Sequence, residues 1–447
     1  MMVNKNDINK PYNSSEYSEM INRLKKHEYN SIHCCKNITF QVTEDCNLGC
    51  TYCYQINKSH NKMTFEVAKK CIDSLFEDEK LKEYIHFDEI YTIILDFIGG
   101  EPFLEVELMD KIVEYFIYQS INHNKPTWAS MFMISISTNG TLYFNENVQK
   151  FLKKYKDKIS LGITIDGNKE MHDKCRIFKD TKKGSYDIVS EAIKDWITKV
   201  PSIESKITIS PFNITKIYSA ITYLFKEFDY QTVNANCVFE EGWNTSHAII
   251  YYDQLKKIAD WILDNDLELK KNTSLFSAFK YEPMNPDNNQ NWCGGSGIML
   301  AFDYKGDAFP CLRFMKSSLG DKVKPITLGS VYDGILKTKD IIDEIHDLES
   351  ITRRSQSTDE CFNCPIAEGC AWCTAYNYQA TGSYNKRATY ICIMHKAQSL
   401  ANAYFFNKAY RKHNLKDRKK IYCPDEWALE IISNDELNML KELAKED

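Results

Sequence analysis

The sequence contains no run of apolar residues that could cross a membrane, because no stretch of the 447 residues approaches the roughly 18 consecutive apolar residues that a spanning helix needs. The opening stretch, MMVNKNDINKPYNSSEYSEM, also lacks the apolar core of a secretory signal. We therefore expect a soluble, cytoplasmic protein without a membrane partner.

The sequence also has no excess of positive charge, since 56 Lys and Arg face 62 Asp and Glu, for a net charge of -6. This balance argues against a nucleic-acid partner. Internal repeats and low-complexity tracts are absent too, which excludes solenoid and fibrous classes. With 43% hydrophobic and 26% charged residues, the composition is that of a globular protein. The length predicts two or three domains with room for a buried site.

Cysteine, in contrast, is abundant, with 16 residues. In a chain without a secretory signal, cysteines favour metal ligation or redox chemistry over a disulfide framework. Three of them fall close together in TEDCNLGCTYCYQ, and seven fall within residues 293–395. The sequence therefore predicts that some of these cysteines are metal ligands.

Segments typical of strands and of helices alternate over the first two thirds of the chain. Strands are predicted at 38–43, 91–98, 132–137, 159–165, 206–210 and 231–239, and helices at 65–83, 105–122, 145–156, 186–199 and 215–227. Six alternations predict an α/β fold with a parallel sheet, either open and doubly wound or curled into part of a barrel.

The alternation stops near residue 270, and the part that follows is rich in turns and cysteines. Such a loop-rich region needs metal ions or clusters to stay folded. We expect an N-terminal extension over 1–36, a sheet-forming domain over 37–270, a cysteine-rich domain over 271–395 and a helical segment over 396–447.

Cys46, Cys50 and Cys53 follow the first predicted strand directly. Three thiolates in one tight loop can hold a four-iron cluster and leave one iron open to an exogenous ligand. This Cys-x3-Cys-x2-Cys spacing with its aromatic residue, Tyr52, resembles the signature of the radical S-adenosylmethionine (SAM) superfamily. The resemblance implies that the open iron is chelated by SAM and that Tyr52 lies near the adenine. The alternatives are a zinc knuckle or three buried cysteines.

Further motifs follow the next strands in order, and the resemblance covers about residues 37–240. Glycines at the end of the second strand allow a ligand to approach the backbone. The Asn-Gly and Asp-Gly pairs that follow the third and fourth strands are also ordinary turn sequences. By resemblance, the segment Gly99, Gly100, Glu101 and Pro102 contacts the SAM ammonium, and Ser137, Asn139, Thr164 and Arg176 line its ribose and carboxylate.

The later cysteines resemble the SPASM extension, an auxiliary-cluster domain found on radical SAM enzymes that modify peptides and proteins. The resemblance implies a distal cluster held by Cys361, Cys364, Cys370 and Cys392, and a proximal cluster held by Cys293, Cys311 and Cys373. The sequence departs from the usual pattern where only two residues separate Cys370 from Cys373. Two Cys-x2-Cys pairs also fit a tetrahedral zinc site.

Three ligands leave the fourth position of the proximal cluster undefined. Either a substrate thiolate binds an open iron there, or a leftover cysteine or a non-cysteine side chain fills the position. The cysteines without an assigned role are Cys34, Cys35, Cys71, Cys175, Cys237 and Cys423. We expect most of them to be structural.

The resemblance as a whole implies a partial (β/α)6 TIM-type barrel followed by the SPASM domain, with three 4Fe-4S clusters and SAM. In such enzymes one-electron reduction cleaves SAM to a 5′-deoxyadenosyl radical, which abstracts hydrogen from carbon. The catalytic residues are then Cys46, Cys50 and Cys53. The protein supplies orientation and excludes side reactions.

The segment CAWCTAYNYQ and the overall layout resemble maturases that form thioether bonds in cysteine-repeat precursor peptides. A precursor peptide and a flavodoxin-type or ferredoxin-type reductant are the implied partners. One rival is the anaerobic sulfatase maturase, whose relatives carry an Asp after the second SPASM cysteine, where this chain has Leu312. Another class also stays open, namely an iron–sulfur electron carrier or a zinc-stabilised scaffold without SAM chemistry.

Overall fold

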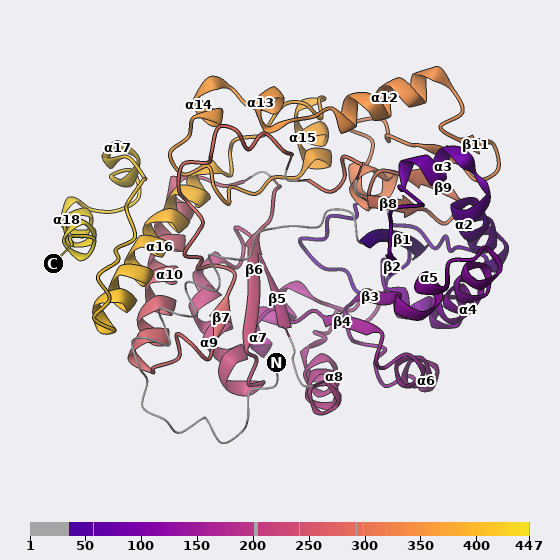
Figure 1. Ribbon diagram of the computed structural model, residues 1–447. Coiled ribbons are helices and arrows are strands. Elements are labelled where there is room, and N and C mark those ends of the chain that lie inside the picture. The colour runs from indigo at the N-terminus through magenta and orange to yellow at the C-terminus, as the bar shows by residue number, and fades with distance from the viewer. Residues whose placement is uncertain are drawn as a thin grey trace.

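The structure is a computed structural model that describes residues 35–446 except residues 57, 201–203, 241, 292 and 298. Cys34 and nearly all of the predicted N-terminal extension, residues 1–36, lie outside the described residues. Figure 1 shows a curved layer of strands with helices on its outer side, and the C-terminal half of the chain arches over it. The α/β class predicted from the sequence is confirmed.

Most strands belong to one sheet in the order β11-β10-β9-β8-β1-β2-β3-β4, and β5, β6 and β7 form a second sheet. The six predicted strands are confirmed as β1 (Cys35–Thr43), β2 (Thr92–Gly99), β3 (Met133–Thr138), β4 (Ile159–Ile163), β5 (Glu204–Ile209) and β6 (Thr232–Cys237). The added strands are β7 (Asn272–Thr273), β8 (Met299–Phe302), β9 (Asp307–Phe309), β10 (Gly329–Ser330) and β11 (Gly334–Ile335).

The predicted run of parallel strands is divided between β4 and β5. Within each group the strands are parallel, and β4 contacts β5. Among the described residues, however, β4 and β5 share no hydrogen-bonded ladder. The strands therefore form a partial barrel that is split at this point.

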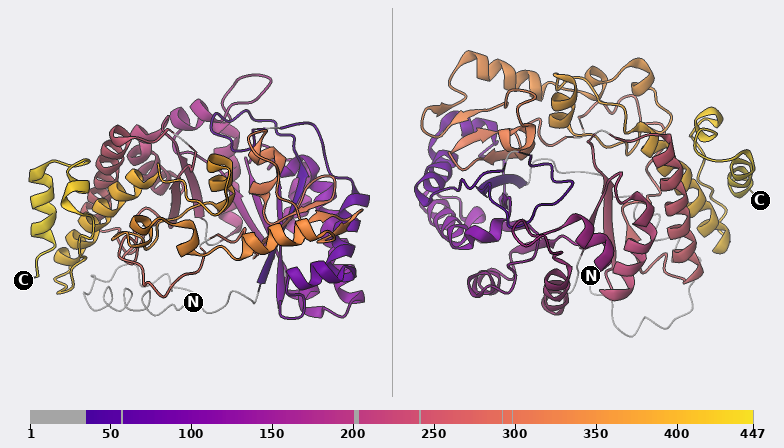
Figure 2. Two further views of the ribbon diagram at one scale, coloured as in Figure 1. Left: turned by 90° about the horizontal axis from the view of Figure 1, so that it is seen from above. Right: turned by 180° about the vertical axis from the view of Figure 1, so that it is seen from behind.

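The helices between the strands pack on the outer side of the barrel (Figures 1 and 2). They are α2 (Phe65–Glu77), α3 (Glu79–Tyr84), η2 (Pro102–Glu105), α4 (Val106–Asn122), α5 (Pro126–Met131), α6 (Glu146–Lys154), α7 (Lys169–Cys175), α8 (Tyr186–Lys199), η3 (Ile214–Lys216), α9 (Ile217–Glu227) and α10 (Thr245–Asp264). The single helix predicted over 65–83 is two helices. Asp78 separates them, because its carboxylate accepts a hydrogen bond from the Leu81 N–H at 2.9 Å and caps α3.

The two faces of the barrel strands differ in chemistry. On the outer face, Phe40 of β1 is fully buried, and its ring centre lies 6.1 Å from that of Phe97 and 5.8 Å from that of Phe302. The inner face carries Ile94 and Ile98 on β2, but its other residues are mostly polar or small: Thr39 and Gln41 on β1, Asp96 on β2, Ser135 and Ser137 on β3, and Ser160 and Gly162 on β4. Ser137 and Ser160 are exposed. We call the space that this inner face borders the lumen, and its polar lining distinguishes it from the packed interior of a closed barrel.

The C-terminal region shares its sheet with the first strands, because β8 pairs with β1 in parallel. The elements that follow are η4 (Leu312–Phe314), α11 (Lys316–Leu319), α12 (Lys339–Glu349), α13 (Arg353–Gln356), α14 (Asp359–Phe362), α15 (Thr374–Thr381), α16 (Cys392–Lys412), α17 (Asp425–Ala428) and α18 (Asn434–Leu443). The long helix α16 packs against α10. Among the described helices, none is both long and apolar enough to cross a membrane. The domain limits inferred from the sequence stay a prediction.

Candidate active site

The loop after β1 brings Cys46, Cys50 and Cys53 together. The Cys53 N–H donates to the Cys50 carbonyl at 3.3 Å, and the three thiols lie within electrostatic reach of one another. Burial raises the pKa of the Cys46 and Cys50 thiols, that of Cys50 to about 11. Such thiols lose their protons readily only when a bound metal stabilises the resulting thiolates, so this donor set fits an iron–sulfur cluster.

Lys58 adds a positive charge to this loop. Although burial lowers the pKa of its ammonium group, Cys53, Cys46 and Cys50 together raise it above its usual value. A lone lysine in a loop belongs to no motif, so this residue could not be found from the sequence. A cation beside three thiols favours their anionic form.

The end of β2 docks directly onto this loop. A Cβ at Gly100 would lie 2.2 Å from the Asp45 carbonyl oxygen, and the Glu101 N–H donates to that oxygen at 2.8 Å. The sequence suggested that these glycines let a ligand approach the backbone. At Gly100 the group that approaches is the cysteine loop itself, so glycine here fixes the loop against the sheet.

Glu101 ties the ends of β2 and β3 together. Its carboxylate is fully buried and accepts hydrogen bonds from the Thr138 hydroxyl at 2.6 Å, the Asn139 N–H at 2.8 Å and the Phe103 N–H at 3.1 Å. Burial outweighs these donors and raises its pKa. The Phe103 bond caps η2, which begins at Pro102. The contact of Glu101 with SAM stays a prediction.

Asn139 connects β3 to the cysteine loop. Its side-chain NH₂ donates to the side-chain oxygen Oδ1 of Asn47 at 2.9 Å and lies 3.8 Å from the Cys46 sulfur. Thr164, after β4, donates its N–H to the Thr138 carbonyl at 3.0 Å. The predicted SAM-binding residues at the ends of β2, β3 and β4 therefore surround one loop.

Arg176 and Tyr52 meet at a carboxylate that the sequence reading passed over as part of a turn. Arg176 Nε donates to Asp166 Oδ2 at 2.8 Å, and the Tyr52 hydroxyl donates to the same oxygen. Arg176 Nη1 also lies 4.0 Å from the Cys50 sulfur. The other oxygen, Asp166 Oδ1, is buried and has no hydrogen-bond partner among the described residues. An orphaned buried acceptor fits a polar ligand such as SAM.

His172 on α7 is hydrogen-bonded to this network. Its Nδ1 accepts the Asp166 N–H at 3.3 Å, and its Nε2 shares a hydrogen bond of 2.9 Å with the Ser185 hydroxyl. Burial, followed by the charge of Arg176, lowers the pKa of His172 to about 4. The imidazole is therefore neutral at physiological pH, as an acceptor at Nδ1 requires.

The proximal set, Cys293, Cys311 and Cys373, also converges. The Cys311 and Cys293 sulfurs lie 3.1 and 3.5 Å from the position that a Cβ at Gly295 would take, and the charge of Cys373 acts on Cys311. Gly295 thus leaves open the space that both sulfurs border. Burial raises the pKa of the Cys311 and Cys373 thiols.

Arg313 and Tyr54 connect the proximal set to the loop after β1. The Arg313 guanidinium lies 4.8 Å from the centre of the Tyr54 ring and donates to Glu240 at 3.0 Å. Tyr54 follows Cys53 directly, and its phenol lies within electrostatic reach of Cys311. Tyr54 is therefore a neighbour of both the loop after β1 and the proximal set.

The distal set, Cys361, Cys364, Cys370 and Cys392, lines a single cavity of about 380 Å³. Arg387 bridges two of these residues: Nη1 lies 3.2 Å from the Cys361 sulfur and Nη2 lies 3.2 Å from the Cys370 sulfur. Burial alone raises the pKa of Cys370, but His395 and Arg387 bring it down to about 6. Four cysteines around one cavity fit a fully ligated cluster.

The leftover cysteines that the structure describes have neighbours elsewhere. Cys35 begins β1. Cys175 forms a hydrogen bond with Thr51, and Cys237 forms one with Tyr251. Cys71 lies near Asp303, and Cys423 lies near Cys364. None of these five described cysteines is placed at the proximal set. Within the described part of the chain, no three His, Cys, Asp or Glu side chains are grouped to hold a single metal ion.

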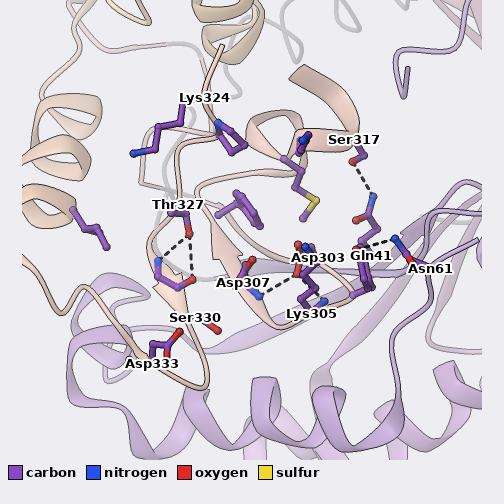
Figure 3. A pocket seen from close by; sticks show the side chains of 18 of the residues that line it. Gln41, Asn61, Asp303, Lys305, Asp307, Ser317, Lys324, Thr327, Ser330 and Asp333 are labelled. Atoms are coloured by element: carbon purple, nitrogen blue, oxygen red, sulfur yellow. Dashed lines mark hydrogen bonds between the residues drawn. The ribbon is translucent and has the colours of Figure 1, made fainter. Parts of the chain in front are cut away.

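A larger cavity, of about 720 Å³, lies beside β9 and β10 (Figure 3). Its wall includes Gln41, whose side-chain NH₂ donates to the Ser317 hydroxyl at 3.1 Å, together with Asp303 and Lys305. The described residues that line this cavity include no cysteine. Cavity size alone therefore does not locate the chemistry, whereas the convergence of the cysteines does.

Residues 40–213 match the family model described as Radical SAM superfamily. The chain is 26% identical over 296 residues to the antilisterial bacteriocin subtilosin biosynthesis protein AlbA of Bacillus subtilis, with 63% of this chain and 56% of that protein covered. It is 30% identical over 195 residues to the cysteine-type anaerobic sulfatase-maturating enzyme of Clostridium novyi, with 42% and 47% covered. The chain spans about half the length of these curated relatives.

A solved structure, native anSMEcpe with bound AdoMet and Cp18Cys peptide, has the same fold. The TM-score is 0.57 at 17% sequence identity, and the match covers 85% of this chain and 99% of that chain. The match extends through the C-terminal half, so the predicted partial barrel with a cysteine-rich C-terminal region is confirmed as a fold.

Proposed function

Because this chain is a radical SAM enzyme related to SPASM-type peptide maturases, we propose that it cleaves SAM reductively and modifies a ribosomally made, cysteine-rich peptide. The modification that we propose is a thioether bond between a cysteine sulfur and a carbon atom. When bound, the cluster and SAM supply the radical chemistry, and the chain's own side chains orient the reactants.

The observation that carries this proposal is that two sets of three cysteines share one neighbour, Tyr54. Cys46, Cys50 and Cys53 would hold the cluster that reduces SAM, and Cys293, Cys311 and Cys373 would hold an auxiliary cluster. Tyr54 contacts the surroundings of both sets. A reacting carbon and a sulfur held beside these two sets would therefore be close together.

Around the first set, the chain offers polar groups suited to SAM. Asp166 Oδ1 is an acceptor without a partner, and Arg176 and Tyr52 fix the orientation of that carboxylate. Ser137 presents a hydroxyl to the lumen. We propose that these groups bind the ribose and carboxylate of SAM, and that Glu101 acts through the strand ends that it joins.

A peptide is the substrate class that the lumen fits best. Its inner face carries the hydroxyl groups of Ser135, Ser137 and Ser160, which can pair with the amide groups of a peptide backbone. Among the similar proteins, anSMEcpe has been solved with a bound peptide and AlbA is a bacteriocin biosynthesis protein. Both support a peptide substrate for this chain.

Two observations favour thioether formation over formylglycine formation. The proximal set has three cysteines, and the described leftover cysteines lie elsewhere, which supports an open position for a substrate thiolate. Leu312 follows Cys311, so the chain lacks a carboxylate at the place where sulfatase maturases carry one. Formylglycine formation stays the second candidate function, because this chain is 30% identical over 195 residues to the Clostridium novyi enzyme.

The test is anaerobic reconstitution followed by counts of iron and sulfide and an assay for 5′-deoxyadenosine with dithionite as reductant. We expect about twelve irons per chain, as three 4Fe-4S clusters require, and steady SAM cleavage. About four irons with one zinc would overturn the auxiliary clusters, and an iron-replete protein that leaves SAM intact would overturn the enzymatic proposal. A flavodoxin-type or ferredoxin-type protein is the reductant that we propose in the cell.

A further inference from the structure

Asp96 is a carboxylate on the inner face of β2, inside the lumen. The strand register places it between Thr39 of β1 and Ser135 of β3. The Thr39 hydroxyl donates to Asp96 Oδ2 at 3.0 Å, and Ser135 also forms a side-chain hydrogen bond with this carboxylate. Asp96 is 9% exposed, whereas Ser137, two residues further along β3, is exposed. The carboxylate therefore lies at the edge of the accessible part of the lumen.

Within the described part of the chain, no cation acts on the charge of Asp96. The groups that face it are the two hydroxyls and, from the loop after β1, the phenol of Tyr54. Arg313, which stacks on Tyr54, is already paired with Glu240 at 3.0 Å. Burial raises the pKa of Asp96 despite the opposing effect of its two hydroxyl donors. A buried carboxylate in this setting is stabilised by taking up a proton.

Tyr54 also relates Asp96 to the proximal set. Its phenol lies within electrostatic reach of Asp96, of Cys53 and of Cys311. Cys311 belongs to the proximal set, where the proposed function places the substrate cysteine. Asp96 and the proximal set therefore share Tyr54 as a neighbour.

We propose that Asp96 accepts the proton of the substrate cysteine thiol as that thiol reaches the proximal set, an inference that rests on the proposed function. The S–H bond breaks, an O–H bond forms on the Asp96 carboxylate, and both electrons of the S–H bond stay on sulfur. Nothing is oxidised or reduced in this step. The step is needed because the thiolate, not the thiol, is both the nucleophile and the metal ligand.

The experiment follows a thiol probe, N-acetylcysteine amide, binding to the reconstituted full-length protein between pH 6 and 8. Its affinity is measured from the visible and EPR spectra of the clusters. In the wild type the proton stays on Asp96, so the affinity should change less than about threefold over this range. In Asp96→Asn the proton goes to solvent, and the affinity should rise about tenfold per pH unit.

Two comparisons isolate the carboxylate. Thr39→Val removes one hydroxyl bond but no proton acceptor, and it should keep the weak pH dependence of the wild type. N-acetylselenocysteine amide carries a selenol, a stronger acid than a thiol, so it should bind the wild type and Asp96→Asn alike. A pH-indicator dye in weak buffer tests the wild type without any variant, and we expect no net proton release on probe binding.

The failures can be told apart. Equal pH slopes for the wild type and Asp96→Asn, or release of one proton per probe bound to the wild type, would overturn the role of Asp96 alone. No binding of either probe to an iron-replete wild type would overturn both this role and the open position at the proximal set. SAM cleavage in the absence of probe would still report on the proposed radical chemistry.

Discussion

The loop after β1 and the distal set hold their cysteines on different supports. The loop extends from a strand whose outer face is fully buried at Ile38 and Phe40, and Gly100 packs its backbone against that of Asp45. Among the distal cysteines, Cys361 lies in the four-residue helix α14, Cys364 and Cys370 lie on the loops that follow it, and Cys392 begins α16. Around the distal cavity, the Arg387 guanidinium joins two cysteines by polar contacts. At the loop after β1, apolar packing supports the cysteines instead.

This difference separates two uses of a cluster. At the loop after β1, the apolar core and the strand-end hydrogen bonds define the geometry, and the cluster adds chemistry. At the distal set, the cluster would itself join segments that have little regular structure, as structural metals do in small domains. Loss of the first cluster should therefore abolish activity, whereas loss of the distal cluster should loosen the fold of the C-terminal region.

The largest expected effect comes from replacing Cys46, Cys50 and Cys53 together by alanine. SAM cleavage should fall to the background of free dithionite, because no open iron remains. The melting temperature should stay close to that of the wild type, because the core of β1 and β2 is unchanged. The measurements are 5′-deoxyadenosine by chromatography and thermal unfolding by circular dichroism.

The matched control is the double substitution of Cys361 and Cys364 by alanine. It removes the same type of ligand from the distal set, and we expect new protease cleavage sites within 351–395. Equal loss of stability in both variants would contradict the comparison.

A second large effect should follow from removal of all iron by an anaerobic chelator. Amide hydrogen exchange in 351–395 should accelerate at least tenfold, which is about 1.4 kcal/mol of local stability. Amides of β1 to β4 should keep their protection, because their hydrogen bonds lie in a packed sheet. Uniform acceleration over the whole chain would show that the barrel also depends on its cluster.

The six barrel strands could be predicted from the sequence because alternation is a local pattern. The three cysteine sets followed from a resemblance, and their roles as cluster ligands stay predictions. The sequence did not predict that β8 joins β1 or that β4 and β5 share no ladder among the described residues, because strand pairing depends on distant contacts. The partners Arg387 and Lys58 were missed for the same reason. Single charged residues in loops acquire a role only when the fold brings them beside cysteines.

A third prediction is that acid weakens the hydrogen bonds that His172 forms with Asp166 and Ser185. The pKa of this histidine is about 4 in the folded protein and about 6.5 in the unfolded chain, so the unfolded chain binds the proton more readily. Stability is therefore present above pH 6.5 and is lost as the pH falls toward 4, by about 3 kcal/mol. Hydrogen exchange of α7 between pH 7 and 5 should show this loss.

His172→Asn is the control, because an amide can keep a hydrogen bond to Ser185 but does not titrate in this range. Its α7 amides should lose less protection on acidification than those of the wild type. The same acid dependence in both proteins would assign the effect to another group.

The smallest effect concerns the two guanidinium groups beside the clusters. Arg387 contacts two distal sulfurs at 3.2 Å, whereas Arg176 lies 4.0 Å from one sulfur and is paired with Asp166 at 2.8 Å. Hydrogen bonds and positive charge stabilise the more negative, reduced cluster. Arg387→Met should therefore lower the distal midpoint potential, by roughly 60 mV if the reduced state loses a tenfold preference.

Redox titrations followed by EPR would measure this shift, with Arg387→Lys and Arg176→Lys as comparisons. Lysine at 387 keeps the charge but reaches fewer sulfurs, so its shift should be smaller than that of methionine. Lysine at 176 should change the potential of the first cluster least, because Asp166 already balances the charge at that position. A distal potential that is unchanged in Arg387→Met would mean that the guanidinium holds the loops together without tuning the cluster, which would place Arg387 among the structural supports of the C-terminal region.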